Sequence, residues 1–206
     1  MARAPQARPD GRRRKPRQSR SHLTVASILE ATERLAARDG FHRLETARIA
    51  AAAGISIGSL YQYFANLEAI VLALYEERTA EVARTMKEAM VAIVDQPPED
   101  ALPGVMDLIL RLHEKHRLIV HQLATEMPQL RLRAHPASVD RLTHGSVVNY
   151  LRHRDPRMTT GERNRKAFFL ERVVLGCVRS YLDDPADVPR AAFVRDLTKI
   201  CVRYLE

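Results

Sequence analysis

Residues 45–64 (ETARIAAAAGISIGSLYQYF) constrain this chain most, because they contain two short helical patterns with a glycine between them. Residues 49–53 carry an alanine-rich apolar face that suits one helix. Gly54 is the residue type that most readily takes the positive φ found at helix ends, and Ser56 is a preferred N-cap. The segment therefore predicts two helices joined by a tight turn, with the second beginning near Ile57.

The second of these helices has an apolar side and a polar side on a helical wheel. Leu60 and Phe64 lie on the apolar side, and Ile57 leans toward it. The polar side presents hydrogen-bonding groups where an ordinary surface helix carries Lys and Glu, and such groups suit the base edges and phosphates of a DNA major groove. Gly58, through which the backbone can approach closely, lies on this side with Ser59 and Gln62, and Tyr61 and Tyr63 flank it.

Residues from about 18 to 70 are similar to the DNA-binding domain of the tetracycline-repressor (TetR) family of bacterial transcription regulators. The motifs that carry the resemblance are RQSRSHLTVASILEA, Gly40-Phe41, TARIAAAAGIS, IGSLYQYF and residues 66–70. The resemblance implies an all-α protein whose second and third helices form a helix-turn-helix and whose later helices dimerise and bind a ligand. By position it implies DNA contacts from Thr46, Arg48, Ser59, Tyr61, Gln62 and Tyr63.

Three positions depart from the family pattern. The family commonly has threonines where Leu44 and Glu45 stand, and a phosphate-binding lysine where Leu67 stands. Glu45 brings a negative charge near the expected phosphates, and Leu67 removes an ionic contact. These departures predict weaker binding to the DNA phosphates.

The composition favours one small DNA-binding unit and a larger helical body. The chain has 206 residues, no Trp and only 5% aromatic residues, and it contains no apolar run long enough to cross a membrane. We expect a cytoplasmic protein without a membrane partner, whose two cysteines are reduced, buried thiols. The expected divisions are a disordered basic arm (1–20), a helix-turn-helix domain (21–66) and an effector-binding and dimerisation domain (67–206).

The basic arm holds most of the net charge. Residues 1–20 carry eight Arg or Lys side chains and one Asp, against a net charge of +8 for the whole chain. Such a segment cannot bury enough apolar surface to become ordered alone. Beside a DNA-binding unit it predicts phosphate binding or insertion into a minor groove, and a solvated tail that aids solubility is the alternative. The residues of the basic arm expected to contact DNA are Arg12, Arg13, Arg14, Lys15, Arg17 and Arg20.

Helical periodicity continues along the rest of the chain. A first helix is expected from the N-cap Thr24 to Gly40, and a long helix from the N-cap Asn66 to the stop at residues 96–98. Further helices are expected at about 100–127 with a break near His116, and at 136–153, 160–183 and 189–205, with breaks at Pro128, at 135–136, at 155–156 and at 183–185. The last two helices are apolar over a wide arc, which suits either a dimer interface near Gly176 or the core of the protomer.

A pocket for a small-molecule effector in the body is implied by the resemblance. Neither the identity of this effector nor the direction of its effect on DNA binding follows from the sequence. The middle helices offer apolar and mixed-polarity candidates to line the pocket: Met106, Leu110, His113, His121, Met127, Tyr150, Phe168 and Arg172.

Two motifs suggest rival chemistries. Residues 54–58 spell Gly-x-Ser-x-Gly, but a hydrolase nucleophile elbow needs a strand before its serine, and here helical alanines precede Ser56. His113-Glu114-Lys115-His116 with His121 resembles a metal site but lacks the spacing of a zinc protease. We therefore expect no enzyme activity, no metal and no cofactor.

The sequence is best interpreted as a ligand-responsive transcription regulator. We expect a homodimeric repressor that binds a near-palindromic double-stranded operator and releases it when an effector enters the body. A helical sensor or scaffold without specific operator binding is the alternative, motivated by Leu44, Glu45 and Leu67.

Overall fold

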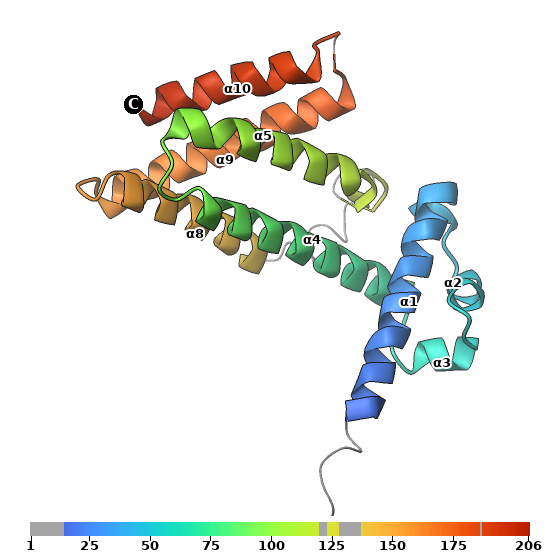
Figure 1. The fold of residues 1–206 in the computed structure, drawn as a ribbon. Helices are drawn as coiled ribbons and strands as arrows, with labels where there is room; N and C mark the ends of the chain where they lie inside the picture. The colour runs from blue at the N-terminus through green and yellow to red at the C-terminus, as the bar shows by residue number, and fades with distance from the viewer. Residues whose placement is uncertain (1–14, 120–122, 128–136, 186) are drawn as a thin grey trace, which may run out of the picture. The chain divides into compact units, whose positions relative to one another are not determined.

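The computed structural model describes residues 15–119, 123–127, 137–185 and 187–206. These residues are helical with connecting turns and include no strand, which confirms the all-α class (Figure 1). The chain divides into two compact units, Met1–Leu74 and Tyr75–Glu206, which we call the head and the body. A search of the described residues finds no helix with the length and apolar character of a membrane span.

The head consists of three helices, a 3₁₀ turn and the first two turns of a long fourth helix. Their bounds are α1 Lys15–Asp39, η2 Phe41–Arg43, α2 Thr46–Ala52, α3 Ile57–Tyr61 and α4 Leu67–Ala92. Apolar residues from each of these elements are fully or almost fully buried, and so the head has its own core: Ile28, Leu35, Phe41, Ile49, Leu60, Ile70 and Leu74. Thr32 joins this core because its hydroxyl donates a hydrogen bond to the Ile28 carbonyl at 2.7 Å.

The start of the first helix was predicted wrongly. α1 begins at Lys15, nine residues before the expected N-cap Thr24, so residues 15–20 of the expected disordered arm are helical. Pro16 is tolerated in a first helical turn, where its missing N–H has no partner, and Gln and Arg propagate a helix well once it has formed. Residues 1–14 lie outside the described residues.

Local capping fixes the beginnings of three other helices. The Ser56 side chain accepts a hydrogen bond from the Ser59 N–H at 3.1 Å, and Asn66 Oδ1 accepts one from the Ala69 N–H at 2.9 Å. Both predicted N-caps are thereby confirmed. Thr159 and Glu162 form a reciprocal capping box, with which α9 begins where the sequence predicted.

The described part of the body contains the remainder of α4 and five further helices. Their bounds are α5 Pro98–Lys115, α6 Leu123–Glu126, α8 Ala137–Arg154, α9 Thr160–Asp183 and α10 Arg190–Leu205. These bounds agree with the predicted ranges to within a few residues, and the expected break near His116 is confirmed because His116 is the C-cap of α5. The expected breaks at Pro128 and at 135–136 lie outside the described residues.

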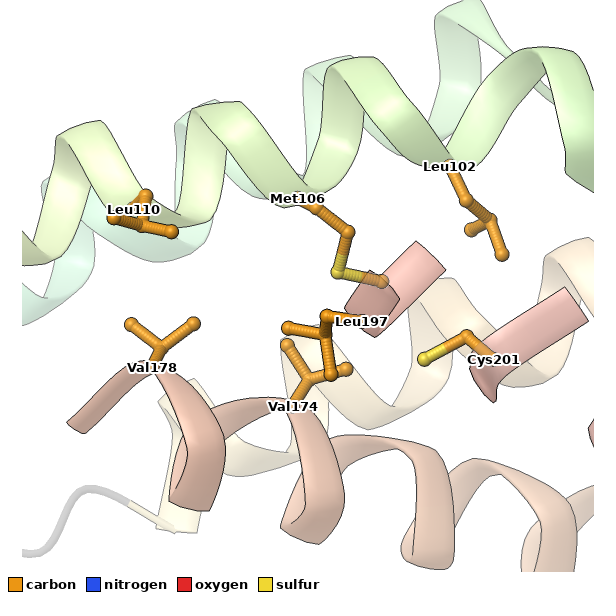
Figure 2. Close-up of a cluster of buried hydrophobic side chains, with 7 residues drawn as sticks. All are labelled: Leu102, Met106, Leu110, Val174, Val178, Leu197 and Cys201. Carbon is orange, nitrogen blue, oxygen red and sulfur yellow. The ribbon is translucent and has the colours of Figure 1, made fainter. Parts of the chain in front are cut away.

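The centre of the body is an apolar seam between α5, α9 and α10. Figure 2 shows α5 directing three side chains toward those of α9 and α10. Each member of the seam is at most 7% exposed: Leu102, Met106, Leu110, Val174, Val178, Leu197 and Cys201. Burial of this kind is the main favourable contribution to folding, so the seam holds the three helices together.

The two cysteines behave as apolar residues. Cys201 belongs to the seam, Cys177 packs against it half-buried, and neither forms a disulfide. Burial raises the pKa of the Cys201 thiol to about 11, so this thiol stays protonated at neutral pH.

Replacement of Leu110, which is fully buried in the seam, should destabilise the body. Leu110→Ala should lower the free energy of unfolding by about 2–5 kcal/mol, because it removes buried methyl groups and leaves a cavity. Urea unfolding followed by circular dichroism at fixed protein concentration measures the change. Val91→Ala is the control, since Val91 is 60% exposed and its change should stay within about 0.5 kcal/mol. Equal effects of the two variants would contradict the seam.

Candidate functional site

The turn before α3 is held by the backbone of the preceding helix. Gly54 has φ of 71°, a conformation that costs glycine little and other residues more. The Ile55 N–H then donates to the Ala50 carbonyl at 3.0 Å, which ties the turn to α2. α3 begins at Ile57, so the predicted pair of helices joined at a glycine is present.

The exposed side of α3 carries the side chains that the sequence placed there. Tyr61 and Tyr63 are 51% and 38% exposed, Gly58 and Gln62 are also exposed, and Leu60 is fully buried. The helix ends at Tyr61, but Gln62 keeps right-handed helical dihedrals, so its position on the wheel is retained. Ile57 differs from expectation, since it is 42% exposed instead of turned toward the core.

Two hydroxyls expected to contact DNA lie against each other. Thr46 Oγ1, at the start of α2, is 3.1 Å from the Tyr61 hydroxyl at the end of α3. Ser59 is half-buried and its hydroxyl is 2.9 Å from that of Ser56, so this side chain is engaged within its own helix turn. Of the polar side chains on this side of α3, Gln62 therefore stays exposed without a hydrogen bond to Ser56 or Thr46, and its contact with base edges stays a prediction.

Arg48 braces the head internally. Its guanidinium forms an ion pair with Asp39 at the end of α1 and donates a hydrogen bond to the Arg43 carbonyl at 3.1 Å. Hydrogen bonds from Arg38 and Arg48 hold the pKa of the Asp39 carboxyl well below its usual range. The DNA contact expected of Arg48 stays a prediction, and it would require this brace to open.

The three departures from the family pattern occupy different environments. Leu44 is only 6% exposed and contributes to the head core, so its side chain is not on the surface. Glu45 is exposed immediately before α2, and Leu67 is half-buried at the first position of α4. Of the three, Glu45 is the one whose charge faces solvent beside the helix-turn-helix.

The body contains a cavity of about 550 Å³ lined by α4, α5, α8, α9 and α10. Its volume lies in the range of small-molecule sites, and most lining side chains are apolar. Leu110 is buried in the seam instead, Met127 is not among the lining residues, and His121 lies outside the described residues. The other predicted pocket residues do line the cavity: Met106, His113, Tyr150, Phe168 and Arg172.

The sequence predicted only Tyr150 from α8, and it did not identify residues 143–148 of that helix or any part of α4 as cavity wall. Val82, Met86 and Met90 line it from α4, and residues 143–148 line it from α8. The i, i+4, i+8 spacing on α4 was visible as an apolar stripe, but it did not reveal which surface it faces. Methionine side chains adapt to ligands of different shape, which suits a binding cavity.

A few polar contacts organise the cavity wall. His144 Nδ1 on α8 is 3.0 Å from Glu171 Oε2 on α9, and the Arg172 guanidinium lies 5.3 Å from the centre of the Phe168 ring. The Tyr150 hydroxyl donates to the Gln96 carbonyl at 3.0 Å, and burial raises the pKa of this phenol. The wall therefore contains cationic, anionic and hydrogen-bonding groups within a mainly apolar surface.

The residues of the rival chemistries have other roles. Ser56 is the N-cap of α3, and helix α2 precedes it where a hydrolase would need a strand. His116 ends α5 and is 3% exposed, with its Nε2 3.9 Å from Glu81 Oε1. Among the residues that the structure describes, no group of three or more His, Cys, Asp or Glu side chains could hold a metal ion.

The described residues thus combine a helix-turn-helix unit with a helical body that contains an apolar cavity. Residues 28–74 match the family "Bacterial regulatory proteins, tetR family", and residues 97–205 match "Tetracyclin repressor-like, C-terminal domain". The chain belongs to the TetR family of bacterial transcription regulators.

Relatives and solved structures agree with this assignment. A Bacillus subtilis protein described as a fatty acid metabolism regulator is 28% identical over 106 residues, which are 52% of this chain and 55% of that protein. The chain thus spans about half the length of the curated relative it matches. A structure described as that of a TetR-family regulator from Mesorhizobium loti is 16% identical with a TM-score of 0.73, over 90% of this chain and 96% of the other. The Bacillus subtilis regulator FadR in complex with stearoyl-CoA is 16% identical with a TM-score of 0.65, over 88% and 99%. These two likenesses establish the fold.

The geometry of α3 predicts different effects for two of its side chains. Gln62→Ala should weaken operator binding by about 1–3 kcal/mol and leave binding to random DNA nearly unchanged, since an exposed amide reads base edges. Tyr61→Phe should weaken both to a similar extent, because a rim hydroxyl paired with Thr46 suits a phosphate. Fluorescence anisotropy on both DNAs measures the effects. Equal losses on both DNAs for Gln62→Ala would contradict base reading by this face.

Proposed function

We propose that this chain is an effector-responsive repressor that binds an operator through α3 and releases it when a small molecule fills the body cavity. The observation that carries the proposal is the course of α4, which begins at Leu67 in the head and lines the cavity with Val82, Met86 and Met90. A ligand that moves this part of α4 would act on the same helix whose first two turns belong to the head. The protein would work in the cytoplasm, where the DNA is, and as a regulator, not an enzyme.

The proposed mechanism is a shift between two conformational populations. The effector favours a geometry in which two recognition helices no longer match successive major grooves, which lie about 34–36 Å apart. Coupling of this kind changes affinity by about 5–150-fold. Filling the cavity supplies the differential binding free energy that such a shift needs.

The class of effector proposed is a molecule with a long apolar part. The cavity is lined mainly by aliphatic and methionine side chains, which an apolar ligand would remove from water. The stearoyl-CoA complex of Bacillus subtilis FadR supports the same class for a protein of the same fold. The lining proposed for this site keeps the predicted residues Met106, His113, Tyr150, Phe168 and Arg172.

A homodimer through α9 and α10 is the proposed assembly. Besides the seam, these helices carry a second apolar face, on which the Phe169 and Tyr204 rings lie 6.4 Å apart. An exposed patch of this kind on a soluble chain indicates an interface, and a second copy of the chain would cover it symmetrically. The exposed residues of this face are Phe169, Val173, Gly176, Ile200 and Tyr204.

The basic arm is proposed to add nonspecific affinity. Lys15, Arg17 and Arg20 lie in the first turns of α1, and Arg12, Arg13 and Arg14 lie outside the described residues. Arginines and lysines joined to a DNA-binding head displace counterions from phosphates, whatever the base sequence.

A sensor or scaffold without operator specificity is the competing proposal, and exposed Glu45 favours it. A mobility-shift assay with the protein's own upstream DNA, repeated at several salt concentrations, separates the two. We expect the upstream DNA to retain binding at salt concentrations that abolish binding to random DNA, because base contacts do not depend on counterion release. Identical salt dependence for both DNAs would support the scaffold.

The dimer proposal predicts the effect of a charge at Gly176. A Cβ built at this position meets no atom within 4 Å, so Gly176→Glu fits the folded protomer and replaces a poor helix former. The variant should sediment as a monomer and lose most operator affinity, because it buries an unpaired charge between subunits. Gly176→Ala, which adds only a methyl group, is the matched control and should remain dimeric. A dimeric Gly176→Glu variant would place the interface elsewhere.

A further inference from the structure

The lining of the body cavity is divided between an apolar end and a polar end. At the apolar end, described residues of all five lining helices pack as one cluster: Met90, Val105, Tyr150, Leu151 and Ala167, with Leu205 against them. The ionisable side chains with His, Glu or Arg groups come from other turns of α5, α8 and α9. Among the described lining residues they are His113, His144, Glu171 and Arg172.

These two groups of side chains lie at opposite ends of the cavity. Four helices run from the apolar cluster toward the polar residues. Away from the apolar cluster, α8 runs back to His144 and α9 runs forward to Glu171, and these two side chains meet at 3.0 Å. In the same direction away from the apolar cluster, α4 reaches Glu81 and α5 reaches Lys115. Glu81 Oε1 accepts a hydrogen bond from Lys115 Nζ at 2.7 Å. On this side of the apolar cluster, one polar contact thus joins α8 to α9 and another joins α4 to α5.

Among the described residues, Arg172 is the cation of this end that has no acidic partner. The Glu171 carboxylate is engaged by His144, whereas none of the described acidic residues forms an ion pair with Arg172. The Arg172 side chain is exposed and its guanidinium lies over the Phe168 ring, an attractive contact that keeps it beside the cavity. A guanidinium in this position suits a carboxylate or phosphate, to which it can donate two parallel hydrogen bonds.

The lined wall of the cavity has a length that an acyl chain can fill. On α5 the lining runs from Leu102 to His113, which corresponds to about 16 Å at the helical rise of about 1.5 Å per residue. An extended chain advances about 1.2 Å per bond, as the peptide backbone does, so about 13 bonds span this length. A tail of about 14 carbons therefore matches the lined wall.

We infer that the effector is a linear amphiphile whose anionic head group binds Arg172 and whose tail extends toward Tyr150. The inference rests on the proposed function and adds to it the orientation of the ligand, the charge of its head group and the residue that selects it. The anion has two possible sources, the carboxylate of a free fatty acid or the phosphates of its coenzyme A thioester. Both present oxygen anions attached to the same apolar tail.

Titration calorimetry on the full chain tests this assignment directly, without DNA. The probes are myristate, its methyl ester and its coenzyme A thioester, each below the concentration at which it forms micelles. Arg172→Gln should weaken binding of the charged probe by about tenfold and leave the methyl ester unchanged, because only the ionic hydrogen bonds are lost. Arg179→Gln is the matched control, since Arg179 lies two turns further along the same helix and does not line the cavity.

The outcomes separate the inference from the proposed function. A loss with myristate identifies the carboxylate as the ligand of Arg172, and a loss with the thioester alone identifies the phosphates; either result supports the inference. An unchanged preference for the charged probes over the ester in Arg172→Gln would overturn it. Failure of the unmodified protein to bind any of the three probes would also overturn it, whereas specific retention of upstream DNA in the shift assay would show that the DNA-binding function stands.

Discussion

Burial of the apolar seam between α5, α9 and α10 is the interaction on which the rest of the body depends. The seam uses one side of α9, through Val174 and Val178, and one side of α10, through Leu197 and Cys201. Once these sides are buried, the remaining faces of α9 are fixed in direction. Phe168 and Arg172 face the cavity, and Phe169, Val173 and Gly176 form the exposed apolar face. A single packing choice thereby sets both the candidate ligand site and the candidate dimer interface.

In the head, the short helix α3 depends on its neighbours for stability. α3 has only five residues, fewer than an isolated helix needs for stability in water. It is positioned by the buried Leu60, by the turn at Gly54 and by the contact of Tyr61 with Thr46 on α2. The ion pair of Arg48 with Asp39 joins α2 to α1 in turn. The exposed side of α3 can therefore consist of residues chosen for recognition, since other residues supply its stability.

One helix, α4, contributes side chains both to the head core and to the cavity wall. The first two turns of α4 follow the Asn66 cap and contribute Ile70, Val71 and Leu74 to the head core. Further along, the same helix gives Val82, Met86 and Met90 to the cavity wall. An amphiphilic ligand that spans the cavity would contact this wall over about two turns, from Val82 to Met90, which gives it the contact area needed to favour one position of α4 over another.

The sequence by itself determined the helical class, the ends of most helices and the turn before α3. These features depend on groups within one turn of the chain: the Ser56 and Asn66 caps, the capping box at Thr159 and the prolines that end helices. It misplaced the start of α1, because propagation from a formed helix extended through residues with no strong stop signal. The tertiary structure alone decided which faces meet. It directed Arg48 toward Asp39, placed Leu110 in the seam and assembled the cavity from five helices. Periodicity gives the face of a helix that is apolar, but the partner of that face depends on residues distant in the sequence, whose packing no local pattern specifies.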